Sequence, residues 1–160
     1  MLVFSRKRWA DKYSTPISMK EVHVKIIRYD EFGGPEVLRV EEVPVPQAGP
    51  GEVLVRVEAA GLNFADIMQR RNAYLQPTPL PAFPGGEIAG TVEAVGEGVT
   101  TVAVGSNVMA VISGCGYAEF TVVPAGMVFP LPPGLSNYQA LALQVQGLTA
   151  YLLLKEAAHV

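Results

Sequence analysis

The side chains that most often bind a catalytic metal are few in this sequence and lie far apart along it. The chain has one cysteine, Cys115, and two histidines, His23 and His159. A catalytic zinc ion usually takes three protein ligands from cysteine, histidine and carboxylate side chains. We therefore predict no metal site, with His23 facing outward from a strand, His159 in solvent and Cys115 in a glycine-rich turn.

Two other kinds of catalytic or binding motif are also missing from the sequence. Gly96-Glu97-Gly98 begins like a dinucleotide-binding fingerprint, but no third glycine follows in register and no helix is indicated after it. We interpret this segment as a turn between strands. Neither histidine stands in the setting of a serine or cysteine triad, so we do not predict nucleophilic catalysis.

A polar segment at residues 61–66 is the strongest local candidate for a site. Asn63 and Asp66 are three positions apart at the predicted start of a short helix, so their side chains share a face. With Arg70 and Arg71 one turn further on, they could form a polar cluster at the mouth of a cleft. The alternative is an ordinary helix start, in which Asn63 caps the helix and Asp66 accepts hydrogen bonds from its first turn.

Short strands must carry most of the structure that positions this segment. The clearest strand has Val53, Val55 and Val57 on one face, which is predicted to face the core. Prolines exclude a regular element over 77–84, and glycines mark the corners of a second block of strands over 87–124. Many short strands separated by turn residues predict a small sandwich or barrel.

The last part of the chain is predicted to be helical. Ser136 and Gln139 have the spacing of a capping box, and an apolar run follows them. A second helical stretch is predicted from about Leu148. No glycine or proline closes this stretch before Val160, so we expect the chain to end inside a larger architecture.

Composition and charge restrict the classes of function. Apolar residues make up 49% of the 160 residues and charged residues 17%, which is typical of a folded domain. The net charge of −3 provides no basic surface for a phosphate backbone, so we predict no nucleic-acid partner. No apolar stretch is long enough to span a membrane, and the single cysteine fits a reducing compartment, so we predict a cytoplasmic protein.

Four stretches of the sequence together resemble a known protein family in their order and spacing. They are FGGPEVLRVEEVPVPQAGPGEVLVRVEAAGLNFADIMQRR, LPAFPGGEIAGTVEAVGEGV, GYAEF and LQVQGLTAYLLL. The sequence resembles the N-terminal GroES-like domain of the medium-chain dehydrogenase/reductase superfamily, and within it the zinc-independent, zeta-crystallin-like quinone oxidoreductases. The resemblance covers residues 32–154.

The residues at the family's metal positions agree with the zinc-independent branch. Zinc-dependent alcohol dehydrogenases have a cysteine ligand at the position of Asn63 and a histidine ligand at the position of Gly86. Glu87 remains beside them and cannot hold zinc alone. The four-cysteine lobe of those enzymes is also missing. The resemblance therefore implies an oxidoreductase without zinc.

The resemblance implies a mainly β fold: a GroES-like, partly open antiparallel β-barrel with short helices and a C-terminal helical segment. It divides the chain into a basic extension over 1–18, a catalytic domain over 19–134 and the start of the interdomain helices over 135–160. The implied reaction is hydride transfer from NADPH to a quinone or another electron-poor enone. The family's Rossmann domain would follow, and we expect the chain to be inactive without it.

Carried over by position, the resemblance assigns six residues to the site: Asn63, Asp66 and Tyr74 as catalytic, Asn63, Gln146 and Thr149 as contacts of the nicotinamide, and Tyr74 and Tyr117 at the substrate pocket. Met68 stands where several relatives have a tyrosine, so no role is expected for a hydroxyl there. The alternative to catalysis is an interaction module. Such a module would bind a separate Rossmann chain or a second copy of itself through its C-terminal helix.

Overall fold

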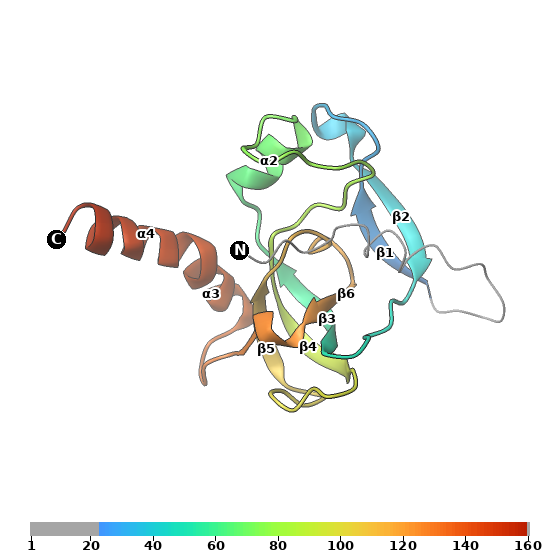
Figure 1. Cartoon of the computed structure of the whole chain (residues 1–160), viewed down its shortest axis with the longest axis vertical. Coiled ribbons are helices and arrows are strands. Elements are labelled where there is room, and N and C mark those ends of the chain that lie inside the picture. Colours follow the sequence, from blue (N-terminus) through green and yellow to red (C-terminus); the bar gives the residue numbers. More distant parts are fainter. Residues whose placement is uncertain (1–22, 160) are drawn as a thin grey trace.

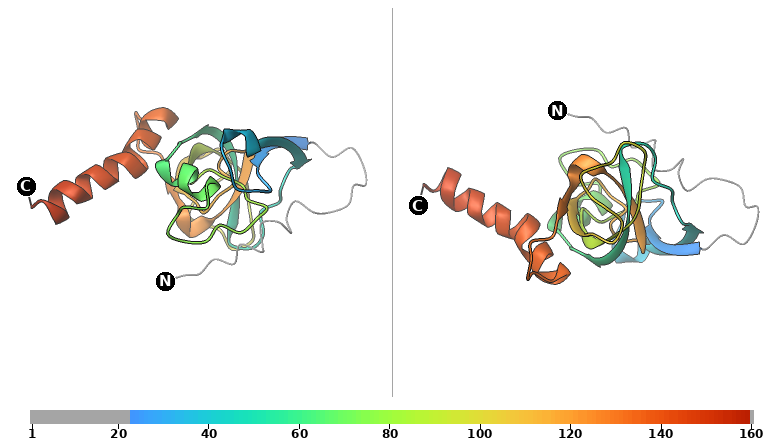
Figure 2. Two further views of the ribbon diagram at one scale, coloured as in Figure 1. Left: turned by 90° about the horizontal axis from the view of Figure 1, so that it is seen from above. Right: turned by 90° about the horizontal axis from the view of Figure 1, so that it is seen from below.

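The structure is a computed structural model that describes residues 23–159, so the predicted basic extension over 1–18 lies outside the described residues. The described chain forms a β-rich unit and a helical arm that projects away from it (Figure 1). Two further views show the same projection, and the strands curve around one another in the β-rich unit (Figure 2).

A five-stranded antiparallel sheet forms the centre of the β-rich unit. Its strands are β3 (Glu52–Ala60), β4 (Glu87–Val95), β5 (Asn107–Val111), β6 (Phe120–Pro124) and β7 (Val128–Pro130). The order across the sheet is β6-β3-β4-β5-β7, with β6 and β7 as its two edges, so the sheet is open. This arrangement confirms the predicted fold class of mainly antiparallel β-structure with short helices and a C-terminal helical segment.

The core of the β-rich unit lies on one face of this sheet. Val53 and Val55 are completely buried, and Val57 packs against the same cluster while it stays partly exposed. The predicted inward face of β3 is therefore confirmed. Ile88 of β4 joins the cluster from the neighbouring strand, so the centre of the sheet is held by branched aliphatic side chains that suit a pleated surface.

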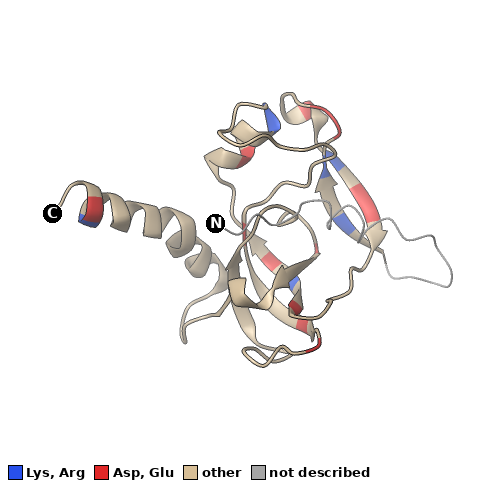
Figure 3. Ribbon diagram, in the orientation of Figure 1, with Lys and Arg blue, Asp and Glu red and all other residues tan. Residues whose placement is uncertain are grey.

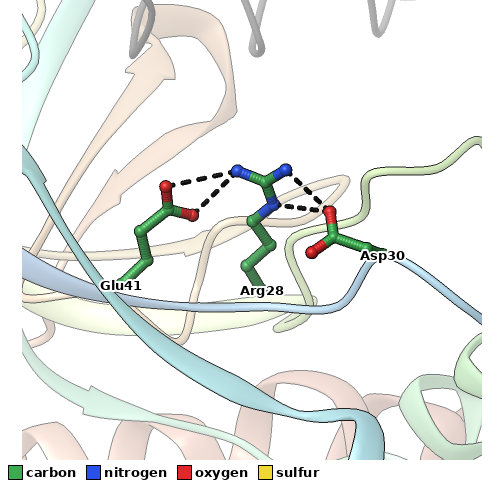
Figure 4. A network of polar contacts seen from close by, with 3 residues as sticks. All are labelled: Arg28, Asp30 and Glu41. Carbon is green, nitrogen blue, oxygen red and sulfur yellow. Dashed lines mark hydrogen bonds and ion pairs between the residues drawn. The ribbon is translucent and has the colours of Figure 1, made fainter.

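Two shorter strands pair into a second sheet. These are β1 (His23–Arg28) and β2 (Arg39–Pro44), and a single turn of helix, η1 (Pro35–Val37), lies between them. Figure 4 shows Arg28 of β1 between two carboxylates: its Nη1 donates to Glu41 Oε2 of β2 at 2.9 Å, and its Nε donates to Asp30 Oδ1 at 2.8 Å. The pair of strands contacts the rest of the unit through an antiparallel bridge between Ile26 and Ala118.

The helices begin and end close to the places that the sequence predicts. The first, α2 (Phe64–Arg70), follows β3, and a short 3-10 turn, η2 (Ala125–Met127), precedes β7. The chain then forms one continuous helical run, α3 (Asn137–Leu141), η3 (Ala142–Gly147), α4 (Leu148–Leu152) and η4 (Leu153–Ala157), which we call the C-terminal arm. The helical stretch predicted from about Leu148 is α4, and it continues the run without a break, because one internal glycine, Gly147, weakens a helix by only about 1 kcal/mol.

The C-terminal arm contacts the β-rich unit mainly at its beginning. Leu141 is buried against Ala59 of β3 and Ala89 of β4, and Ala140 is buried beside it. Beyond these residues the leucines of the arm and Tyr151 are exposed. Across residues 23–159, no helix is both long enough and apolar enough to pass through a membrane.

Candidate functional site

Asn63 lies between the end of β3 and the start of α2, and it forms hydrogen bonds both within α2 and to residues outside it. It is the N-cap residue of α2 and forms a capping box with Asp66, whose Oδ2 accepts the Asn63 backbone N–H at 2.9 Å. The Asn63 carboxamide also contacts residues outside the helix, because its Nδ2 donates to Glu87 Oε1 at 2.8 Å. The capping role and the site role considered from the sequence are therefore combined in one residue.

The Asp66 carboxylate connects three segments of the chain. Besides the Asn63 N–H, Oδ2 accepts the hydroxyl of Tyr117 at 2.9 Å, and Oδ1 accepts the backbone N–H of Gly85 at 3.2 Å. Asp66 is buried, and a buried carboxylate is costly unless hydrogen bonds satisfy it. Both of its oxygens are satisfied here, so the group holds α2, the segment before β4 and the segment before β6 together.

Tyr117 lies half-buried beside this carboxylate. Its hydroxyl lies 3.2 Å from the carbonyl oxygen of Gly61 as well as within hydrogen-bond distance of Asp66. Burial is the main cause that raises the pKa of Tyr117 well above its ordinary value, and the negative charges of Asp66 and Glu87 raise it further. The phenol therefore stays protonated at neutral pH and acts as a donor.

Glu87 belongs to this cluster, although the sequence assigned it no role beyond a position at which it could not hold zinc alone. It is the first residue of β4 and is completely buried, with one oxygen on the Asn63 amide. Within residues 23–159, its second oxygen, Oε2, has no hydrogen-bond partner. A signal was present in the sequence, because an acidic residue opens the otherwise uncharged buried run Glu87-Ile88-Ala89-Gly90.

Gln146 brings the C-terminal arm into contact with this cluster. Its Nε2 donates to Asn63 Oδ1 at 2.9 Å, so the Asn63 amide is bonded on both sides. Gln146 itself is exposed to solvent. We call the hydrogen-bonded set Asn63, Asp66, Glu87, Tyr117 and Gln146 the site network.

The other residues expected at the site lie outside the site network. In the described part of the chain, no side-chain hydrogen bond joins Tyr74 or Thr149 to it. Thr149 is exposed three residues beyond Gln146 on the arm, and Tyr74 is 40% exposed after α2. Arg70 points away from the site network, because its buried guanidinium donates to the carbonyl of Gly33. Arg70 therefore does not join Asn63 and Asp66 in the polar cluster that the sequence suggested.

The candidate metal donors occupy separate places in the fold. His23 is exposed on β1, as expected for an outward-facing strand residue, and His159 is exposed beyond the arm. Cys115 is buried with a positive φ of 64°, and burial raises the pKa of its thiol to about 12. Over the residues that the structure describes, no three histidine, cysteine or acidic side chains form a group that could hold a metal ion.

Comparison with known proteins places this geometry in a family. Residues 49–133 match the family described as the alcohol dehydrogenase GroES-like domain. The chain is 42% identical over 125 residues to the synaptic vesicle membrane protein VAT-1 homolog of Rattus norvegicus, an alignment that covers 77% of this chain and 31% of the relative. It is 39% identical over 132 residues to the quinone oxidoreductase of Mus musculus, which covers 79% of this chain and 39% of the relative.

A solved structure agrees with these sequence relatives. The quinone oxidoreductase of Escherichia coli, complexed with NADPH, superposes with a TM-score of 0.77 at 34% sequence identity. The superposition covers 83% of this chain and 41% of that chain. The chain thus spans less than half the length of each of these relatives. It belongs to the alcohol dehydrogenase GroES-like domain family of the medium-chain dehydrogenase/reductase superfamily, with quinone oxidoreductases and VAT-1 homologues among its relatives.

Proposed function

We propose that this chain forms the substrate-facing half of a zinc-independent, NADPH-dependent reductase that acts on a quinone or another electron-poor enone. The observation that carries the proposal is the bond between Gln146 and Asn63, which presents two carboxamides at the point where the arm meets the β-rich unit. Relatives named quinone oxidoreductase, one of them complexed with NADPH, support the same reading. A soluble, cytoplasmic enzyme is part of this proposal.

The site network suggests a division of labour among its residues. Asn63 and Gln146 carry the groups that would contact the nicotinamide and the substrate. Asp66 and Tyr117 act by positioning, because the contacts of Asp66 already hold α2 against the neighbouring segments. Tyr74 and Thr149 are exposed. Tyr74 would line the edge of the pocket on the substrate side, and Thr149 would line it on the cofactor side.

The residues present fit the nicotinamide end of NADPH. Carboxamide side chains both donate and accept hydrogen bonds, so Asn63 and Gln146 match the carboxamide that the nicotinamide carries. When bound, NADPH would supply the hydride that reduces the acceptor. These 160 residues contain no glycine-rich fingerprint for the pyrophosphate. A Rossmann domain would have to bind that part of NADPH, either as the next domain in the family's order or as a separate chain.

The alternative function is an interaction module, and the exposed arm favours it. Leu148, Tyr151, Leu152 and Leu154 are 46–57% exposed. Figure 3 shows charged residues on the arm only toward its end, where Lys155 and Glu156 lie. Apolar surfaces of this kind commonly mark protein–protein contacts, so the arm would bind a Rossmann chain or a second copy of this one.

Calorimetric titration of the chain with NADPH tests the need for a second domain. Charge-assisted hydrogen bonds to the pyrophosphate contribute about 1.5–3 kcal/mol each, so losing two weakens binding by roughly a thousandfold. We expect no binding at micromolar NADPH and no quinone-dependent NADPH oxidation. Tight binding with turnover by the chain alone would contradict the proposed division between two domains.

A fusion of this chain to the cofactor-binding half of the E. coli quinone oxidoreductase tests the reaction itself. We expect the fusion to oxidise NADPH in the presence of a benzoquinone. Asn63→Ala should lower kcat/KM about tenfold, the effect of losing one hydrogen bond at the site. Gln76→Ala is the matched control, because Gln76 is exposed in the segment after α2, and it should leave the rate unchanged. Equal rates for the two variants would contradict the role proposed for Asn63.

A further inference from the structure

The Glu87 carboxylate is a polar group buried among apolar side chains, so its burial gains no hydrophobic stabilisation. It is completely buried at the start of β4, between the apolar residues of the sheet and the junction of β3 with α2. No cation pairs with it among the residues from 23 to 159: its one side-chain hydrogen bond comes from the Asn63 amide. A buried acidic group with a single partner is costly, and the one side chain that bonds it, Asn63, belongs to the site network.

The contact between Glu87 and Asn63 determines which way the Asn63 carboxamide faces. A carboxylate oxygen only accepts hydrogen bonds, so the group that faces Glu87 Oε1 at 2.8 Å has to be the NH₂ of Asn63. The carbonyl oxygen, Oδ1, then faces the opposite way, toward the exposed Gln146, whose Nε2 lies 2.9 Å from it. The orientation follows from the chemistry of the two groups.

We propose that Glu87 is a positioning residue that holds the Asn63 amide with its NH₂ inward, so that the site offers ligands a hydrogen-bond acceptor at Asn63 Oδ1. The ligand that suits this acceptor carries an amide N–H or a hydroxyl donor, and Gln146 occupies the position of that donor in the free chain. The part of the inference that concerns the ligand rests on the proposed function. The orientation of Asn63 does not.

Hydrogen exchange of side-chain amides in the unaltered chain tests the orientation directly. The NH₂ signals of Asn63 should exchange with solvent at least about tenfold more slowly than those of Asn72, because only the Asn63 amide donates to a buried carboxylate. Asn72 is an exposed asparagine close by in sequence and serves as the reference. Exchange of Asn63 as fast as that of Asn72 would overturn the proposal.

Two substitutions of Glu87 separate positioning from simple packing. Glu87→Met fills a similar volume without an acceptor, so the exchange protection of Asn63 should be lost. Glu87→Gln retains a carbonyl oxygen and should restore most of the protection. A folded Glu87→Met variant with unchanged Asn63 protection would overturn the proposal, and so would a folded Glu87→Gln variant that loses it. If Glu87→Met does not fold, the unaltered chain and Glu87→Gln still decide the outcome.

Nicotinamide and nicotinate test the acceptor that the site presents. Nicotinamide carries an amide donor, and it should shift the side-chain signals of Asn63 and Gln146. Nicotinate has a carboxylate at the same place and should leave them unshifted. Equal shifts from the two probes, or none from nicotinamide, would overturn the ligand assignment. The exchange experiments need neither NADPH nor turnover, so their outcome is separate from the failure or success of the proposed reductase activity.

Discussion

At the scale of single residues, the site depends on how little space surrounds the Glu87 carboxyl group. Gly61, which lies just before α2, donates its backbone N–H to the Glu87 carbonyl at 3.1 Å. A Cβ atom at Gly61 would collide with the Glu87 side chain at Oε1 and Cδ. Because Glu87 is completely buried, its carboxyl group cannot swing into solvent to relieve such a collision. The glycine is required here by close approach.

Gly61→Ala should therefore destabilise the chain and disturb the Asn63 amide. Overpacking of a closely packed site costs about 1–3 kcal/mol, which a denaturant titration measures as a lower free energy of unfolding. Gly126→Ala is the matched control, because nothing lies within 4 Å of a Cβ atom there. A free energy of unfolding equal to that of the control would show that the space around Glu87 is looser than the structure indicates.

Tyr117 should make the stability of the chain depend on alkaline pH. Its ordinary pKa is 10.0, and burial together with Asp66 raises the pKa of the folded form well above that value. Below about pH 10 the phenol is protonated in both states, so its contribution is fully present. As the pH rises further, the unfolded chain loses the proton first, and the free energy of unfolding falls.

The measurement is the free energy of unfolding on both sides of pH 10 in two variants. Tyr117→Phe should reduce the alkaline loss of stability. Tyr138→Phe removes an exposed tyrosine, and its free energy of unfolding should fall at alkaline pH as much as that of the unaltered chain. The same alkaline loss in Tyr117→Phe as in the unaltered chain would mean that Tyr117 is not its source.

At the scale of elements, the start of the C-terminal arm decides where Gln146 can lie. Ser136 caps α3: its Oγ accepts the backbone N–H of Gln139 at 3.3 Å, and its own N–H donates to Gln139 Oε1 at 2.9 Å. The predicted capping box is therefore confirmed. Asn137 Nδ2 also donates to Glu58 Oε2 at 2.6 Å, which connects the first turn of the arm to β3.

Ser136→Ala should lower the free energy of unfolding by about 1 kcal/mol, because the backbone N–H of Gln139 in the first helical turn loses its acceptor, Ser136 Oγ. Denaturant titration followed by the helical circular dichroism signal measures this effect. Ser113→Ala, at an exposed serine after β5, should leave stability within about 0.5 kcal/mol of the unaltered chain. A neutral Ser136→Ala would mean that contacts such as that of Asn137 with Glu58 hold the arm without the cap.

At the scale of the whole molecule, the β-rich unit and the arm differ in what they bury. The strands enclose branched aliphatic side chains such as Val53 and Val55, which are completely inaccessible. The arm buries Ala140 and Leu141 near its beginning, whereas its later leucines, from Leu143 on, and Tyr151 are 46–59% exposed. A helix in water gains most of its stability by packing an apolar face, so this arm is suited to being covered by another surface.

The chain should therefore self-associate as its concentration rises, and light scattering should show an increasing average mass. A double variant, Leu148→Gln with Leu152→Gln, should remain closer to the monomer mass, because it removes apolar surface from the arm. Leu75→Gln is the control, since Leu75 is 97% exposed in the segment between α2 and β4. A constant monomer mass for the unaltered chain over the whole concentration range would rule out the arm as a self-association surface.

The sequence alone determined the local elements and the family. Alternation of residue types indicated the inner face of β3, because side chains of a strand alternate between its two sides. The spacing of Ser136 and Gln139 indicated the start of the arm, because a capping box is formed within one helical turn. Motifs in a fixed order indicated the family, since each motif is a continuous stretch of chain.

Only the tertiary structure decided how the site is assembled. Asn63 lies 24 positions from Glu87 and 83 positions from Gln146, so no local pattern could pair them. Their contacts depend on the register of β3 with β4, which sets Ala60 opposite Ile88, and on the packing of Leu141. Arg70 is the opposite case, because the fold gives it the Gly33 carbonyl as a partner and so removes it from the cluster that its sequence position suggested. Hydrogen bonds between distant residues form only where folding brings donor and acceptor within about 3 Å of each other, which is information that a local sequence pattern does not contain.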